Sequence, residues 1–154
     1  MHLMMVVIFA FLTKPFILSP VGKGDKGFFM TYFVYGGVAC FIFMFLFVGY
    51  FSGMFAGNPD DFNLRGVLKS AMTIMSFYFI VIAIALYNIA VRPGGFGKKI
   101  VCYFFIPVLL IPSLIGIIMS FFSSLIYLIA LYLVNRFVWK WDMIDYLKRI
   151  RTAR

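Results

Sequence analysis

The chain contains no glutamate, and its one histidine is residue 2. All five aspartates lie outside the long apolar stretches, in connecting segments or near the carboxyl terminus. Acid–base pairs, proton relays and metal clusters inside a membrane need ionisable or metal-binding side chains that these stretches do not supply. We therefore predict a protein that is not an enzyme and that holds neither a metal nor another cofactor.

Serine is present in the apolar stretches, but no imidazole lies nearby to activate a hydroxyl as a nucleophile. Such serines usually bond across to another helix or back to the carbonyl of the preceding turn. We expect that role for Ser76, Ser113, Ser120, Ser123 and Ser124.

Cysteine is also scarce, because only Cys40 and Cys102 occur and both lie within apolar stretches. A disulfide would require Cα atoms within about 7 Å of each other, which a sequence does not reveal. We interpret both residues as free thiols that pack like small hydrophobic side chains.

Charge is sparse: charged residues make up 12% of the chain, against about a quarter in soluble domains, while hydrophobic residues make up 64%. The longest polar connection, residues 13–27, is interrupted by prolines and glycines and is too short to bury a core of its own. We therefore predict no separate soluble domain.

Three long apolar stretches, residues 28–57, 67–91 and 100–134, dominate what is present. Each exceeds the roughly 20 residues needed to cross a hydrocarbon core, and Lys69 is the only charged residue in them. Residues 1–27 add a short apolar segment and a basic loop. The run 3–12 favours a re-entrant or in-plane segment, with a span extended to Leu18 as the alternative, in which Lys14 snorkels.

Basic residues are concentrated in three of the gaps. Residues 13–27 carry three lysines against Asp25, residues 92–99 carry three basic residues and no acid, and the tail from Arg136 carries six basic residues. The gap 58–66 instead holds two aspartates and one arginine. The positive-inside rule places the basic gaps and the carboxyl terminus in the cytoplasm, and we assign the protein to a bacterial inner membrane.

This orientation requires the stretch 100–134 to enter the membrane and return. Pro107 and Pro112 each remove a backbone donor and clash with the carbonyl four residues earlier, so we predict a helix break near Pro112. The expected bundle, residues 28–135, has segments 28–57, 67–91, 100–112 and 113–135. The alternative is one long proline-kinked helix that crosses once. The predicted class is an all-α polytopic membrane bundle of about four segments with a proline-broken hairpin.

Small residues recur every four positions in two places. One strip comprises Gly49, Gly53 and Gly57, and the other comprises Gly116, Ser120 and Ser124. Four residues is just over one helical turn, so each triplet forms a smooth face that another backbone can approach closely. These strips are our candidate interfaces, packing either against each other or against another subunit.

Residues 136–154 form a basic tail. Trp139 and Trp141 are expected at the headgroup level, where indole rings settle. Beyond them we predict an amphipathic helix whose apolar residues share one face while Lys148, Arg149 and Arg151 lie largely away from it. This helix would lie on an anionic cytoplasmic leaflet or dock on a cytosolic partner. Nucleic acid is not needed to explain the net charge of +9, because positive-inside topology already does.

The sequence favours a non-catalytic membrane subunit that scaffolds or stabilises a larger inner-membrane assembly, of secretion, conjugation, respiratory or transport type. Its expected partners are other membrane subunits in a hetero-oligomer, together with anionic lipid. One alternative is a small oligomeric channel or carrier, and another is a membrane immunity protein against a pore-forming toxin.

Overall fold

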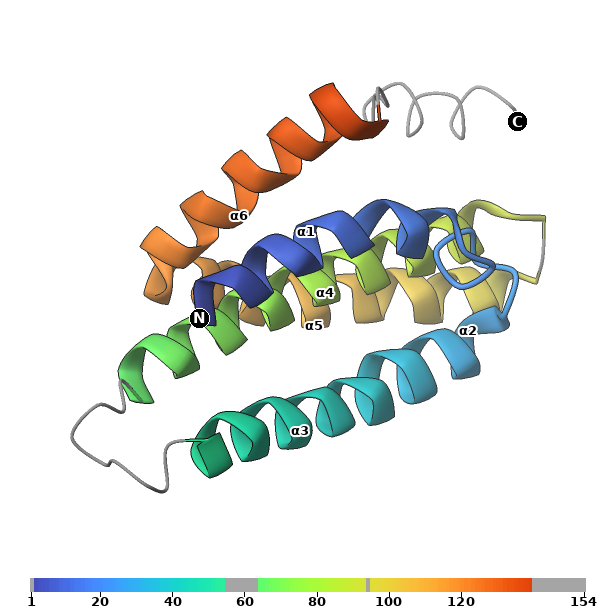
Figure 1. Cartoon of the computed structure of the whole chain (residues 1–154). Coiled ribbons are helices and arrows are strands. Elements are labelled where there is room, and N and C mark those ends of the chain that lie inside the picture. Colours follow the sequence, from blue (N-terminus) through green and yellow to red (C-terminus); the bar gives the residue numbers. More distant parts are fainter. Residues whose placement is uncertain (1, 55–63, 94, 140–154) are drawn as a thin grey trace.

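The computed structural model describes residues 2–54, 64–93 and 95–139, which form helices and contain no strand (Figure 1). The π-helical segments are labelled η. The elements in chain order are α1 (His2–Leu18), α2 (Gly27–Phe29), η1 (Met30–Val38), α3 (Ala39–Met54), α4 (Leu64–Val91), α5 (Phe96–Met119), α6 (Phe121–Leu133) and η3 (Val134–Trp139). The predicted all-α class is confirmed.

Among the described residues, four helical runs are long and apolar enough to cross a membrane. They are Gly27–Phe47, Arg65–Val91, Phe96–Met119 and Phe121–Val138. A shorter apolar run, Met4–Leu18, belongs to α1, which extends to Leu18 and runs alongside α4 instead of across the ends of the bundle (Figure 1). Because this run is shorter than the four candidate spans, both alternatives for the amino-terminal segment stay predictions.

Helix α4 occupies the centre of the bundle. In its apolar window 61% of the residues are buried, against 11% for Gly27–Phe47, 22% for Phe96–Met119 and 28% for Phe121–Val138. Small side chains along α4, including Ala71 and Ala85, are fully buried and let neighbouring helices approach. One apolar cluster joins α4 to α1, α3 and α6, and a second joins its carboxyl-terminal half to α5.

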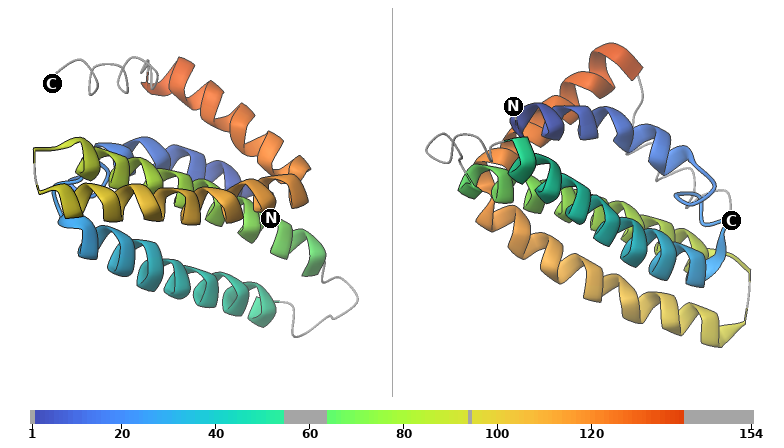
Figure 2. Two further views of the ribbon diagram at one scale, coloured as in Figure 1. Left: turned by 180° about the vertical axis from the view of Figure 1, so that it is seen from behind. Right: turned by 60° about the horizontal axis from the view of Figure 1, so that its bottom comes forward.

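The predicted break at Pro107 and Pro112 is wrong, because both prolines lie inside α5. The chain turns instead at Ser120, whose φ of −112° and ψ of 37° are not helical. Helix α5 is therefore 24 residues and about 36 Å long, so the first arm has full spanning length and the boundary predicted between 112 and 113 moves to 120. Helix α6 then runs back toward the end of the bundle where α5 begins (Figure 2).

The place of the turn has a physical reason. A helix break among apolar side chains leaves backbone N–H and C=O groups without hydrogen-bond partners, at a cost of several kcal/mol each. A proline inside the helix costs less when neighbouring groups bond the carbonyl that it leaves without a donor. Around Ser120, hydroxyls bond carbonyls of the turn, and the Gly116 carbonyl also accepts the Ser120 backbone N–H at 3.0 Å. Ser120 Oγ donates to the Gly116 carbonyl at 2.6 Å, and Ser124 Oγ donates to the Ile117 carbonyl at 3.4 Å. The turn therefore lies where side chains satisfy the backbone.

Both cysteines are free, as predicted. Cys102 is buried in the cluster between α4 and α5, and half-buried Cys40 lies 3.8 Å from the Met75 sulfur. Both thiols therefore serve as packing groups.

Candidate functional site

The strip Gly116, Ser120 and Ser124, here called the inner strip, is buried against α4. A Cβ atom added at Gly116 would overlap the Ser76 hydroxyl of α4, so a side chain at this position of α5 requires that hydroxyl to move. Gly116 thus marks a close approach of the two helices, which is the role that its spacing predicts.

Hydroxyl groups connect the inner strip to α4. Thr73 Oγ1 lies 2.9 Å from Ser120 Oγ as donor, and Ser120 Oγ lies 3.2 Å from Ser124 Oγ, with all three side chains buried. Thr73 Oγ1 is also 3.0 Å from the Lys69 carbonyl oxygen. Because a hydroxyl carries one proton, Thr73 donates to only one of these acceptors at a time. The hydroxyls of Thr73, Ser120 and Ser124 therefore form a hydrogen-bond network between packed helices, and its protons have more than one possible arrangement.

Other serines bond the preceding turn of their own helix. Ser76 Oγ donates to the Met72 carbonyl at 2.7 Å, and Ser113 Oγ donates to the Leu109 carbonyl at 2.6 Å. The expectation that the serine hydroxyls bond the backbone or another helix is confirmed for Ser76, Ser113, Ser120 and Ser124, and it stays a prediction for Ser123. Since each of these protons is engaged by a carbonyl, the bonds hold each side chain against its own helix.

A second polar junction, which the sequence did not reveal, joins α1 to α6. Thr13 Oγ1 and the Tyr127 hydroxyl are 2.5 Å apart, and both side chains are buried. The Tyr127 ring also stacks on Phe77 of α4, with ring centroids 3.9 Å apart. Tyr127 of α6 therefore contacts both α1 and α4.

The loop after α1 is tied to the carboxyl-terminal end of α4. Asn88 Nδ2 donates to the Gly22 carbonyl at 2.8 Å, while Arg92 donates to the Lys23 carbonyl at 2.9 Å and forms an ion pair with Asp25. Gly24 has a φ of +80°, a conformation that favours glycine, where the loop meets α4. The feature of the sequence that indicates this contact is Asn88, whose amide lies near the end of an apolar helix and is buried.

The strip Gly49, Gly53 and Gly57, here called the outer strip, has different surroundings. Gly49 is exposed, and no heavy atom lies within 4 Å of a Cβ built on it. Gly53 lies in α3, and Gly57 lies outside the described residues. The inner strip packs on Ser76 and Thr73 of α4 instead of on the outer strip, so the predicted pairing of the strips is not what the described residues form.

The tail site lies almost wholly beyond the described part of the chain. Trp139 is the last residue of η3, and Trp141, Lys148, Arg149 and Arg151 lie outside the described residues.

Basic residues gather at one end of the bundle. The loop after α1 and the connection between α4 and α5 lie at this end, toward which α6 also runs (Figures 1 and 2). We call it the basic end. Its basic residues are Lys23 and Lys26 in the loop, Arg92 after α4, and Lys98 and Lys99 at the start of α5. The described residues contain no group of three or more His, Cys, Asp or Glu side chains placed to hold a metal.

Comparison with protein-family models, with curated proteins and with solved structures finds no match to the chain.

Proposed function

We propose that the protein is a non-catalytic integral membrane subunit that scaffolds or stabilises a larger assembly in a bacterial inner membrane. The observation that carries this proposal is the outward face of the helix formed by α2, η1 and α3. Its apolar window is 11% buried, so much of the surface of this helix is not covered by the described residues.

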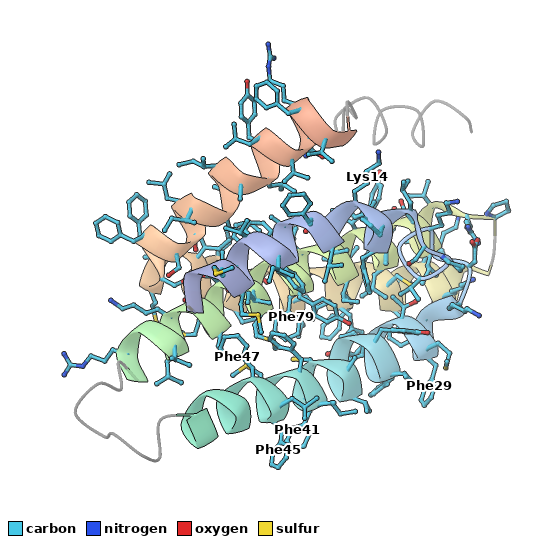
Figure 3. All side chains as sticks on the ribbon, in the orientation of Figure 1. Lys14, Phe29, Phe41, Phe45, Phe47 and Phe79 are labelled. Atoms are coloured by element: carbon cyan, nitrogen blue, oxygen red, sulfur yellow. The ribbon has the colours of Figure 1, made fainter. Side chains whose placement is uncertain are left out.

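Along that face two phenylalanines are followed by one glycine, and this order occurs twice. Every fourth residue belongs to one exposed row, which we call the outer row: Phe29, Phe33, Gly37, Phe41, Phe45 and Gly49. Figure 3 shows Phe29, Phe41 and Phe45 directed away from the bundle, and Phe41 and Phe45 are each 72% exposed. The outer strip continues the same row, because Gly53 follows Gly49 by four residues.

A row of this kind fits another helix better than it fits lipid. In a bilayer the association of helices depends on close van der Waals packing, because lipid tails are as apolar as the side chains. Glycines let a second backbone approach, and neighbouring phenylalanine rings supply large contact areas that fill spaces beside it. Ridges formed by every fourth residue are also the commonest element of helix–helix packing.

Charge supports the orientation and the lipid contact in this proposal. The basic end would face the cytoplasm by the positive-inside rule, which also places the carboxyl terminus there. The tail residues Trp139, Trp141, Lys148, Arg149 and Arg151 would then lie at an anionic leaflet, where each basic residue contributes about 1 kcal/mol. The partners are other membrane subunits in a hetero-oligomer, with anionic lipid around them.

Native mass spectrometry of protein purified in mild detergent tests the proposal, with identification of every co-purifying chain. We expect stoichiometric foreign subunits. A homo-oligomer alone that also conducts ions or solutes in liposomes would replace the scaffold with the channel or carrier. Protection of cells against one toxin, without a constitutive partner, would replace it with the immunity protein.

Gly49→Leu and Gly53→Leu test the surface itself. The matched control is Gly97→Leu, because Gly97 in α5 also has no heavy atom within 4 Å of an added Cβ. We expect the two variants of the outer strip to lose the foreign subunits and Gly97→Leu to retain them. Retention of every subunit in all three variants would remove the outer strip from the interface.

A further inference from the structure

A small cavity lies between α1, α3 and α4 and has a volume of about 170 Å³. Two side chains that line it end in sulfur, because Cys40 Sγ of α3 lies 3.8 Å from Met75 Sδ of α4. The other residues of its lining are Phe9, Ala39, Phe43, Ile74 and Tyr78. The Tyr78 hydroxyl donates to the Tyr35 carbonyl at 2.6 Å. The cavity therefore presents a thiol and a thioether in largely apolar surroundings.

A third sulfur atom belongs to the same part of α3. Met44 follows Cys40 by four residues, which places both on one face of the helix. Its half-buried side chain packs on the apolar cluster that contains Ile74, a residue of the cavity lining. One thiol and two thioethers are thus supplied by α3 and α4.

We propose that Cys40, Met75 and Met44 form a binding site for one Cu(I) ion. Thiolate and thioether sulfurs are soft ligands that select Cu(I), whereas magnesium and calcium require oxygen ligands. With metal–sulfur bonds of about 2.3 Å, as for thiolate on zinc, two sulfurs 3.8 Å apart subtend about 110° at a shared ion. This value is close to the tetrahedral angle, so Cys40 and Met75 bind one ion without moving apart and leave a position for Met44.

Charge favours a monovalent ion in this cavity. When Cu(I) binds, the Cys40 thiol releases its proton to the solution and a sulfur–copper bond forms, with no change in oxidation state. The charges of the thiolate and the ion then cancel, and the thioethers are neutral. A divalent ion would leave one positive charge among apolar side chains, where an unpaired charge is costly, and no residue of the lining carries a carboxylate to offset it. The site therefore distinguishes Cu(I) from Zn(II) by charge as well as by softness.

Cys102 provides a comparison within the same chain. It is buried in the cluster between α4 and α5, and none of the described residues of that cluster is a methionine. The prediction of a chain without a metal rested on histidine, cysteine and carboxylate ligands, so a site with two methionines lies outside it. Cys40 differs from Cys102 because a second sulfur and a cavity lie beside it.

Anaerobic titration of the full-length protein in detergent with Cu(I), in competition with the chromophoric chelator bicinchoninate, tests the site. We expect one Cu(I) per chain, and X-ray absorption of the bound copper should show sulfur neighbours. Cys40→Ala and Met75→Leu should each weaken binding at least about tenfold, since loss of a group that merely orients a ligand already costs about 10–100-fold. Met75→Leu changes little volume and no charge, so it decides the test if Cys40→Ala does not fold.

The matched controls are Cys102→Ala, which removes the other thiol, and Met119→Leu, at a methionine that is 61% exposed. Both should bind Cu(I) like the wild type, and circular dichroism shows whether each variant retains its helices. Wild-type affinity in Met75→Leu, copper with only oxygen or nitrogen neighbours, or equally tight binding of Zn(II) would each overturn the proposal. Copper is measured per chain and not through the foreign subunits, so this outcome is independent of the scaffold proposal.

Discussion

The inner and outer strips have the same spacing of small residues but opposite surroundings. At Gly116 an added Cβ would overlap Ser76, whereas at Gly49 an added Cβ meets no heavy atom within 4 Å. The inner strip is buried by α4, and the described start of the outer strip is exposed. The spacing alone therefore does not determine whether a strip packs within its own chain.

The difference arises because α4 lies against the inner strip, whereas α3 packs on the bundle through another face. Against the inner strip, α4 presents Thr73 and Ser76, which are small and carry hydroxyls that bond across the contact or back to their own backbone. Helix α3 instead packs on the bundle through bulky residues, including Phe43 and Phe47, which leaves Gly49 on the opposite face. A smooth strip needs a matching smooth surface, and α4 offers its own to α5.

Gly116→Leu is expected to have the largest effect on the stability of the chain. The new side chain would collide with Ser76 and separate α5 from α4, and overpacking of this kind costs about 3 kcal/mol. Thermal unfolding in detergent, followed by circular dichroism, measures the loss. Gly97→Leu is the control and should unfold at the wild-type temperature. Equal unfolding temperatures for the two variants would contradict the close approach at Gly116.

Thr73→Val sharpens the comparison by removing a hydroxyl from the inner contact with little change in size. We expect a loss of about 1 kcal/mol, because interhelical hydrogen bonds in membranes contribute about 0.6 kcal/mol on average and at most about 1.7. A double-mutant cycle with Ser120→Ala isolates the pair, and the loss in the double variant should be smaller than the sum of the single losses. Additive losses would show that the two hydroxyls do not stabilise each other.

Tyr127→Phe tests a polar contact between helices that has no small-residue strip. The substitution keeps the stacking on Phe77 and removes the bond to Thr13, so we expect a loss of about 0.6 kcal/mol. Tyr132→Phe, at a residue that is 61% exposed, is the control and should not change the unfolding temperature. An unchanged unfolding temperature for Tyr127→Phe would mean that the ring alone fastens α1 to α6.

The sequence predicted the parts of this structure that depend on local composition. The helical class, the long apolar runs and the bonding of the serines all follow from the need to satisfy backbone and hydroxyl groups among apolar side chains. The turn was misplaced because Pro107 and Pro112 carry the strongest local signal, whereas the location of the turn depends on hydroxyls around Ser120 that come from more than one helix. Local signals thus indicated that a turn was needed but not where its carbonyls would be satisfied.

Long-range contacts were beyond the reach of the sequence. Thr13 and Tyr127 are 114 positions apart, and Asn88 and Gly22 are 66 apart, so no periodicity links either pair. The partner of each strip was likewise undetermined, because Gly116 and Gly49 stand in equally regular patterns. Only the packing of α4 distinguishes them.

Gly49→Leu is expected to have the smallest effect on the chain itself and is the strictest test of the comparison. The substitution is the same as at Gly116, yet the open space around Gly49 predicts a change in unfolding free energy within about 0.5 kcal/mol, as for most surface positions. Replacing a helical glycine also removes an entropic cost of about 0.5–1 kcal/mol, which opposes any residual strain. A large loss of stability in the purified single chain would show that the outer strip packs within the protein, and the role proposed for it in binding another subunit would fall. An unchanged unfolding temperature, combined with loss of the foreign subunits, would instead show that one spacing serves two purposes because α4 covers the first strip and leaves the second for a partner.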